Sequence, residues 1–268
     1  MTGGGPAGGR AGGQVALATV VRYLDQLLRI SEIPDYPDAF NGLEVENSGT
    51  VGKILAAVDA SMATIDAGRA ARGANGPALI IVHHGLFWDG PAPVTGRRYQ
   101  RLRALLEHDV ALYAAHIPLD VHPAVGNNIV LARQLGLNDM IRFDDFKGVP
   151  LGVAGTLAMP REELVSKLGT LLGCTPRLIP GGPPVTAKVG VITGAAGGRV
   201  RAAKAAGCDT FITGEGVHHT YFDAMEFGIN LIYAGHYATE QVGVKALAER
   251  LSEEFGLPWE FFDNPTGL

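Results

Sequence analysis

The chain has 268 residues, of which 47% are hydrophobic and 18% are charged, a composition typical of a globular protein with ample core. Its formal net charge is -5, with no cluster of lysine or arginine, which argues against nucleic-acid binding. No stretch approaches the roughly 18 consecutive apolar residues of a membrane span. The two cysteines, Cys174 and Cys208, are far apart, which argues against a disulfide framework and favours a soluble cytoplasmic protein.

The N-terminal residues 1–14 are rich in glycine and predict a disordered tail. They lack a long apolar segment followed by a cleavage site, so they do not resemble a signal peptide. Apolar residues at helical spacing then predict the first helix over 15–30, and a loop rich in proline and aspartate follows it.

From residue 51 onward, short apolar strands alternate with helices. The pattern predicts strands at 51–59, 77–84 and 110–116 and, after a less regular middle segment, at 187–193, 208–215 and 229–236. Helices are predicted at 61–73, 96–109, 126–137, 198–207, 218–228 and 239–256. Ser61 or Asp59 is expected to cap the first of these helices.

This alternation predicts an α/β fold with two α/β lobes, each a mostly parallel sheet covered by helices. We place the first lobe at 15–145 and the second at 188–268, with a bridging segment at 146–187. No short-period repeat is present.

Polar side chains collect directly after the predicted strands. In chain order they are His83, His84, His116, Asp120, Glu215, His218, His219, His236 and Glu240. In open parallel sheets, ligands bind outside the carboxyl ends of the strands, so both lobes deliver metal-binding side chains to the same kind of place.

Each cluster taken alone has an ordinary alternative. Asp120 could cap the turn at Pro118, Glu240 could complete the first turn of a helix, and the glycines before His218 could form a turn leading into a helix cap. Burying several imidazoles and carboxylates together is costly unless they are paired or bind a cation. The combination of clusters therefore predicts a metal centre.

Histidine mixed with carboxylate, without cysteine, suits zinc, manganese or ferrous iron in a hydrolytic site. Such sites commonly hold two ions about 3.5–4 Å apart. Neighbouring side chains on a regular strand point to opposite faces, but Gly85 permits a turn directly after His84. We therefore expect His83 and His84 to diverge toward two different ions.

The segments FNGLEVEN, VHHGLFW, HIPLD, ITGEGVHH and GHYATE, in this order, resemble the NIF-three-like dinuclear metal-centre proteins, also known as GTP cyclohydrolase I type 2 homologues. The resemblance runs from about residue 20 to the C terminus and implies the NIF-three-like fold, a toroidal homohexamer and two divalent metal ions per subunit. It also implies that the metal ligands are His83, His84, Asp120, His236 and Glu240. Asp120 or Glu240 would bridge the metals.

The same resemblance implies that His116, Glu215 and His218 lie beside the metals as supporting or proton-transfer groups. Longer members of the family carry an inserted domain between the lobes, and the middle segment of this chain is too short for one.

The expected function is that of a metal-dependent hydrolase acting on a nucleotide or a related small molecule. Phe87 and Trp88 could stack on a flat substrate or pack in the core. The segment GAAGG at 194–198 could hold a phosphate or simply form a tight turn from strand to helix. The alternative function is a metal carrier, an insertase or a regulatory scaffold without turnover. Nucleic-acid binding would require the basic helix at 96–109 to line a central cavity.

Overall fold

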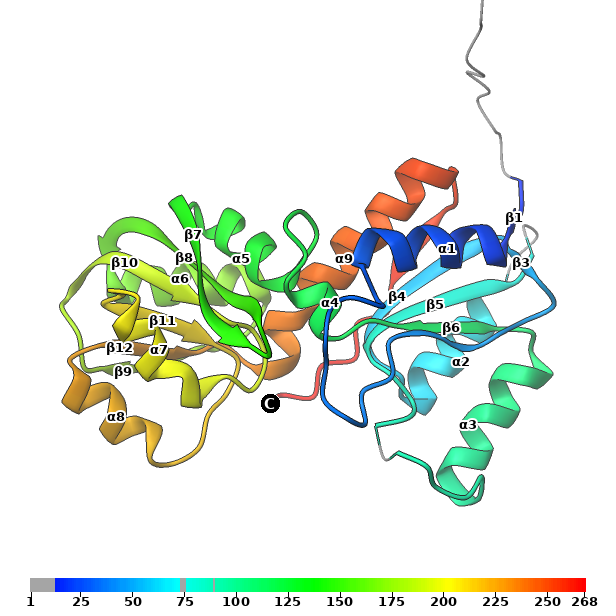
Figure 1. Ribbon diagram of the computed structural model, residues 1–268, viewed down its shortest axis with the longest axis horizontal. Coiled ribbons are helices and arrows are strands. Elements are labelled where there is room, and N and C mark those ends of the chain that lie inside the picture. The colour runs from blue at the N-terminus through cyan, green and yellow to red at the C-terminus, as the bar shows by residue number, and fades with distance from the viewer. Residues whose placement is uncertain (1–12, 73–75, 89) are drawn as a thin grey trace, which may run out of the picture.

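The computed structural model describes residues 13–72, 76–88 and 90–268. The predicted tail, 1–14, lies outside the described residues except for its last two. The described residues form two lobes, each built on one main sheet, and helix α9 (His236–Phe255) runs between them (Figure 1). None of the described helices combines the length and apolar character needed to cross a bilayer.

The first lobe contains a five-stranded sheet in the order β13-β4-β5-β6-β2. Its strands are β2 (Gly42–Val45), β4 (Lys53–Asp59), β5 (Ala78–His84), β6 (Ala111–Ala114) and β13 (Trp259–Phe261). All neighbours are parallel except β2, which runs antiparallel to β6. A separate antiparallel pair is formed by β1 (Val15–Ala16) and β3 (Thr50–Val51).

Alternation along the strands builds a core on each face of this sheet. Leu79 and Ile81 pack with helix α1 (Leu17–Leu28) and the second half of α9, whereas Ile80 and Val82 face the opposite core. Helices α2 (Met62–Ala71) and α3 (Gly96–Glu107) cover that second face. The Ser61 hydroxyl accepts from the N–H of Thr64 at 3.1 Å, so the predicted serine cap of α2 is confirmed.

The second lobe contains a six-stranded sheet in the order β7-β8-β10-β11-β12-β9. Its strands are β7 (Asn138–Phe146), β8 (Val149–Pro160), β9 (Arg177–Pro180), β10 (Val185–Val191), β11 (Thr210–Thr213) and β12 (Asn230–Tyr233). One face packs on α5 (Asn127–Leu135), α6 (Arg161–Leu172) and the first half of α9, and the other packs on α7 (Val200–Ala205) and α8 (Thr220–Phe227). A short helix, α4 (Ile117–Asp120), lies where the lobes meet.

The second sheet is mixed, so the prediction of a mostly parallel sheet is correct for the first lobe and wrong for the second. Only β10, β11 and β12 run parallel to one another. Strands β7 and β8 are antiparallel and are joined at Lys147 and Gly148, which both have positive φ (52° and 87°). A two-residue turn of that geometry closes a hairpin and forces antiparallel pairing. Hydrophobic periodicity carries no information on strand direction.

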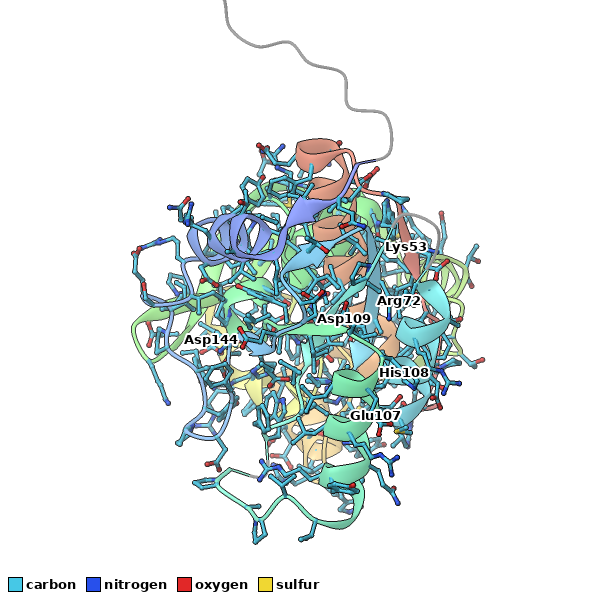
Figure 2. The ribbon with its side chains drawn as sticks, turned by 90° about the vertical axis from the view of Figure 1, so that its right-hand side faces the viewer. Lys53, Arg72, Glu107, His108, Asp109 and Asp144 are labelled. Atoms are coloured by element: carbon cyan, nitrogen blue, oxygen red, sulfur yellow. The ribbon has the colours of Figure 1, made fainter. Side chains whose placement is uncertain are left out.

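The lobe boundaries also differ from the predicted ones. The proposed bridging segment, 146–187, supplies β8, β9, β10 and α6 to the second lobe, and β7 belongs to that sheet as well. Near the C terminus, β13 returns to the first lobe beside β4, where Glu260 forms an ion pair with Lys53 at 2.8 Å (Lys53 is labelled in Figure 2). The pairing of β13 with β4 joins residues far apart in the chain, so local sequence patterns did not reveal it.

Candidate metal centre

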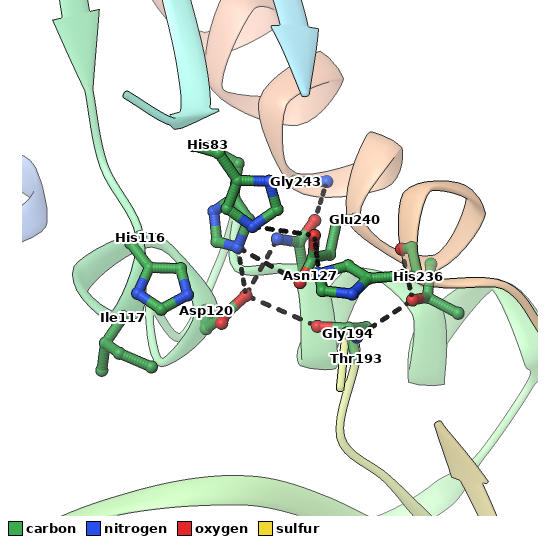
Figure 3. A network of polar contacts seen from close by, with 12 residues as sticks. His83, His116, Ile117, Asp120, Asn127, Thr193, Gly194, His236, Glu240 and Gly243 are labelled. Carbon is green, nitrogen blue, oxygen red and sulfur yellow. Dashed lines mark hydrogen bonds and ion pairs between the residues drawn. The ribbon is translucent and has the colours of Figure 1, made fainter. Parts of the chain in front are cut away.

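Side chains from both lobes converge around the first turn of α9 (Figure 3). The end of β5 contributes His83 and His84, and α4 contributes Asp120. Helix α9 contributes His236 and Glu240, four residues apart and therefore on one face of the helix. The fold thus brings together all five residues that the family resemblance implies as ligands.

Glu240 lies at the centre of this group and faces three imidazoles. Its Oε1 is 3.5 Å from Nε2 of His83, and its Oε2 is 3.3 Å from Nε2 of His84 and 3.1 Å from Nε2 of His236. On the other side, Nε2 of His83 lies 3.7 Å from Oδ1 of Asp120. Two carboxylates, one from α4 and one from α9, therefore face His83.

The opposite nitrogen of each imidazole contacts an oxygen acceptor. The four Nδ1 contacts are His83 to the carbonyl of Ala115 (2.9 Å), His84 to Asp59 (2.8 Å), His116 to Asp35 (2.8 Å) and His236 to Glu215 (2.7 Å). Such a partner fixes the ring proton on Nδ1 and leaves Nε2 as a lone-pair donor to a cation. For His83, His84 and His236, that Nε2 is turned toward the carboxylates.

The contacts at the centre therefore require a positive charge. An unprotonated Nε2 and a carboxylate oxygen are both hydrogen-bond acceptors, and burial makes their repulsion costly. Among the described residues, Nε2 of His83 and Oε2 of Glu240 are buried without a hydrogen-bond partner. Either protons or metal ions must lie between these atoms, and a mixed histidine and carboxylate donor set suits a divalent cation.

The pKa values of the site follow the same logic. Burial disfavours a charged His83, but attraction to Asp120 and Glu240 outweighs it and raises the pKa of His83 to about 10. Burial likewise opposes charge on His236, but Glu240 and Glu215 raise its pKa to about 9. Although burial works against its ionisation, the surrounding histidines hold the pKa of Glu240 well below its usual range. Without metal, protons on the imidazoles supply the positive charge that the carboxylates demand.

Two overlapping sets of side chains have the spacing of cation sites. One consists of His83, His84 and His116, and the other of His84, His236 and Glu240. In each set, one ligand atom per residue lies within 4.8 Å of the others. Because the sets share His84, the two candidate positions are adjacent.

The loop after β10 closes over Glu240. Gly194 has a φ of +70°, and a Cβ at this position would lie 2.2 Å from Oε1 of Glu240. Its N–H donates to the hydroxyl of Thr239 at 3.1 Å. The segment at 194–198 therefore forms a tight turn whose first residue must be glycine to admit the carboxylate.

Three supporting residues were not predicted. Asp35 and Asp59 hold two of the imidazoles, as described above. Asn127 donates to Oδ1 of Asp120 at 2.9 Å and accepts from the N–H of Gly243 at 2.7 Å. Only Asp59, the last residue of a predicted strand, followed the rule that identified the histidines. Asp35 and Asn127 carried no local signal.

The three residues predicted to act beside the metals have different positions. His116 lines the cavity at the centre. Glu215 contacts Nδ1 of His236 from a side chain that is 47% exposed. His218 is exposed, lies edge-on to Phe222 and is not among the described residues that line the cavity.

A cavity of about 480 Å³ opens onto the candidate ligands. Trp88 forms part of its wall, edge-on to His116 with ring centroids 4.6 Å apart and to His84 at 5.6 Å. Phe87 does not line this cavity and packs against the core on one face of the first sheet. Of the two aromatic residues considered for substrate stacking, only Trp88 is in position.

The fold and the site define a two-lobed α/β protein with a histidine and carboxylate centre between its lobes. A sequence profile described as Duf34/NIF3 (NGG1p interacting factor 3) matches residues 15–266, and the chain belongs to this family. The resemblance seen in the sequence motifs is confirmed.

Relatives match over almost the whole chain. A protein from Deinococcus radiodurans named GTP cyclohydrolase 1 type 2 homolog is 44% identical over 260 residues, 96% of each chain. One of the same name from Archaeoglobus fulgidus is 40% identical over 254 residues, 94% of this chain and 99% of its own. The crystal structure of TTHA1606 from Thermus thermophilus has 41% identity and a TM-score of 0.84, covering 95% of this chain and all of that one. The structure of protein ybgI, described as of unknown function, has 36% identity and a TM-score of 0.86 over the same shares.

Proposed function

We propose that the chain is a dinuclear metal-binding protein and a metal-dependent hydrolase of the GTP cyclohydrolase I type 2-like kind, acting on a nucleotide or a related small molecule. The observation that carries this proposal is the set of buried acceptor atoms at the centre, Nε2 of His83 and Oε2 of Glu240, which face other acceptors without a hydrogen bond. The names of the relatives also support it.

In this proposal the ions are held by His83, His84, Asp120, His236 and Glu240. Two bound divalent ions of zinc, iron or manganese would lower the pKa of water toward neutrality and polarise a carbonyl or phosphoryl oxygen. Glu240, which faces three imidazoles, would be the central carboxylate ligand of the bound ions.

The chain's own residues orient this centre and shape its cavity. Asp59 and Glu215 fix the rings of His84 and His236 through their Nδ1 atoms. Asp35 does the same for His116, whose ring lines the cavity and is placed to exchange a proton with a bound substrate. Apolar side chains, including Leu151 and Ile192, line the same cavity and exclude water around the reacting atoms.

The test begins with protein purified without chelator. Metal analysis should find about two equivalents per chain, in line with a two-metal hydrolytic site. A panel of nucleotides, phosphoesters and cyclic amides should then reveal a substrate whose turnover is lost in Asp120→Asn. Less than one bound equivalent would contradict the dinuclear centre. Rapid transfer of metal to an apo acceptor, with no turnover across the panel, would favour the metal carrier instead.

We further propose that the chain assembles as the toroidal homohexamer that the family resemblance implies. Helix α8 and the segment before it expose several large apolar side chains that assembly would cover, namely Val217, Tyr221, Phe222 and Met225. Light scattering of the purified chain should give six times the mass of one 28.1 kDa subunit. We expect the protein to work in the cytoplasm, where the free Cys174 and Cys208 stay reduced.

A further inference from the structure

We infer that Arg199 forms an oxyanion-binding subsite in the cavity of the metal centre, so that the substrate is a small, flat molecule carrying a phosphate or a carboxylate. This inference rests on the proposed function, because it names the class of molecule that the same cavity accepts. The observations that carry it are the composition of the cavity wall, the position of Arg199 and the aromatic rings beside it.

The cavity wall has two parts of different character. One part consists of His116 and four of the five candidate ligands, namely His84, Asp120, His236 and Glu240. The rest is lined mostly by apolar or aromatic residues, among them Tyr36, Trp88, Leu151 and Ile192. Among the described residues that line the cavity, Arg199 is the only lysine or arginine. A cationic side chain at the edge of a mostly apolar wall is a typical orientation group in a small-molecule site.

Arg199 forms an ion pair with a nearly buried carboxylate. Its Nη1 lies 3.3 Å from Oδ2 of Asp144 (labelled in Figure 2). The side chain of Asp144 is 11% exposed, whereas that of Arg199 is 39% exposed. A guanidinium has five N–H donors, more than one carboxylate oxygen accepts, and its planar fork matches the geometry of phosphate and carboxylate. Asp144 therefore attracts the guanidinium as an ion pair without a hydrogen bond, so the N–H groups of Arg199 keep the capacity to bind a second anion.

Two aromatic side chains indicate that the rest of the ligand is flat. Trp88 and Tyr36 line the same cavity as Arg199, and both lie near His116, with ring centroids 4.6 and 5.9 Å from it. Aromatic walls favour planar groups through offset or edge-to-face contacts. A cavity of about 480 Å³ is of the size that holds a small molecule.

With metals bound, the net charge of the centre would favour an anion in the cavity that Arg199 lines. Two divalent ions carry more positive charge than Asp120 and Glu240 neutralise. The carboxylates of Asp35, Asp59 and Glu215 contact Nδ1 atoms on the far side of the imidazoles and do not line the cavity. An oxyanion in the cavity therefore faces the metals and Arg199, not these carboxylates.

The first test uses inorganic phosphate as the probe and metal-loaded protein, with binding measured by calorimetry. Arg199→Gln should weaken phosphate binding about 10- to 100-fold, because a charge-assisted bidentate contact is lost. Arg199→Lys should recover part of the affinity. The control is Arg201→Gln, because Arg201 lies over the ring of Phe227 and is not among the cavity-lining residues. Absence of phosphate binding to the wild type, or equal affinity in Arg199→Gln, would overturn the subsite.

The second test compares GMP with guanosine, which share a flat base and differ in the phosphate. The wild type should bind GMP more tightly, and Arg199→Gln should remove the preference. A wild type that shows no preference for GMP contradicts the inference. Metal content is measured on the same samples. If the wild type holds two metals but binds GMP equally well with and without Arg199, the subsite alone is refuted. If the wild type holds no metals, the proposed dinuclear function is refuted.

Discussion

The side chain of Asn127 donates from Nδ2 to Oδ1 of Asp120 at 2.9 Å, and both side chains are buried between the lobes. The same amide accepts through Oδ1 from the N–H of Gly243 at 2.7 Å, one turn after Glu240 in α9. One buried amide therefore connects the two elements that carry the carboxylates of the centre. Its orientation is fixed, because Asp120 requires a donor and the Gly243 N–H requires an acceptor.

Asn127→Asp should weaken metal binding. The substitution keeps the shape of the side chain and the acceptor for Gly243, but it places a carboxylate oxygen against Asp120. Losing a partner that orients a metal ligand typically lowers metal affinity 10- to 100-fold. Competition with a chromophoric chelator measures the change.

Asn128→Asp is the matched control for that experiment. Asn128 is equally buried and lies on the same helix, but its Nδ2 donates to the carbonyl of Leu151 and not to Asp120. Both variants should lower the melting temperature, because each loses a buried hydrogen bond. Only Asn127→Asp should alter metal affinity strongly, and equal losses in both variants would show that Asn127 acts through general stability.

Gly194→Ala should distort the centre from the second lobe. Its Cβ would lie 2.2 Å from Oε1 of Glu240, so the carboxylate must move and metal binding should fall. The control is Gly173→Ala, because Gly173 has nearly the same φ, +68°, and nothing within 4 Å of the added Cβ. Backbone strain alone costs about 1 kcal/mol in both variants. If Gly194→Ala loses more stability and more bound metal than Gly173→Ala, the difference measures the cost of the clash with Glu240.

Glu240→Gln should remove at least one metal from each chain. A neutral amide is a weak metal ligand, and its NH2 group would face the imidazoles. We expect metal content to fall from about two equivalents to one or fewer, with the circular dichroism spectrum unchanged. Glu249→Gln, at an exposed position of the same helix, should keep the full metal content. Full occupancy in Glu240→Gln would rule out a ligand role.

Stability should depend on pH differently with and without metal. In the metal-free protein the pKa of His83 rises from 6.5 to about 10, so the folded state binds more protons than the unfolded state between these values. The stabilisation is complete below pH 6.5 and is lost as the pH rises toward 10, and His236, with a pKa of about 9, acts in the same direction.

Thermal unfolding between pH 6.5 and 10 measures this effect. The metal-free protein should lose several degrees of melting temperature across this range, since each kcal/mol corresponds to roughly 2–4 °C for a chain of this size. The metal-loaded protein should show a smaller slope, because bound ions replace the protons. Identical slopes would contradict the assignment of the raised pKa values to the imidazoles of the candidate metal centre.

Sequence reasoning located the candidate ligands because their position follows a local rule. A histidine after a short apolar strand lies at the carboxyl edge of a sheet, and β5 and β12 both lead to such residues. The same rule also pointed to His218, which is exposed after β11 (Thr210–Thr213). After β11, Gly216 lies against the ring of Tyr233, whose hydroxyl contacts Thr220, and the intervening residues are exposed. The course of this segment depends on its contact with Tyr233 of the neighbouring strand β12, so the residues of the segment alone do not predict it.

The remaining differences have the same origin. Asp35 reaches His116 across 81 positions of the chain, and β13 crosses back to pair with β4. The predicted helix 61–73 was close to the observed α2, because its serine cap and periodicity lie within the segment. Hydrophobic periodicity therefore predicted individual helices and strands. The pairing of distant strands, and the residues that hydrogen-bond the imidazoles of the site, became visible only in the folded chain.

Helix α9 has a consequence for how a ligand enters. Its first half packs in the second lobe through Val242, and its second half packs in the first lobe through Val244 and Leu247. A clamshell motion of the lobes would have to bend this continuous 20-residue helix just beyond the turn that carries Glu240. Substrate and metal are therefore expected to enter through the mouth of the cavity that Trp88 helps to line, with the lobes held as one body.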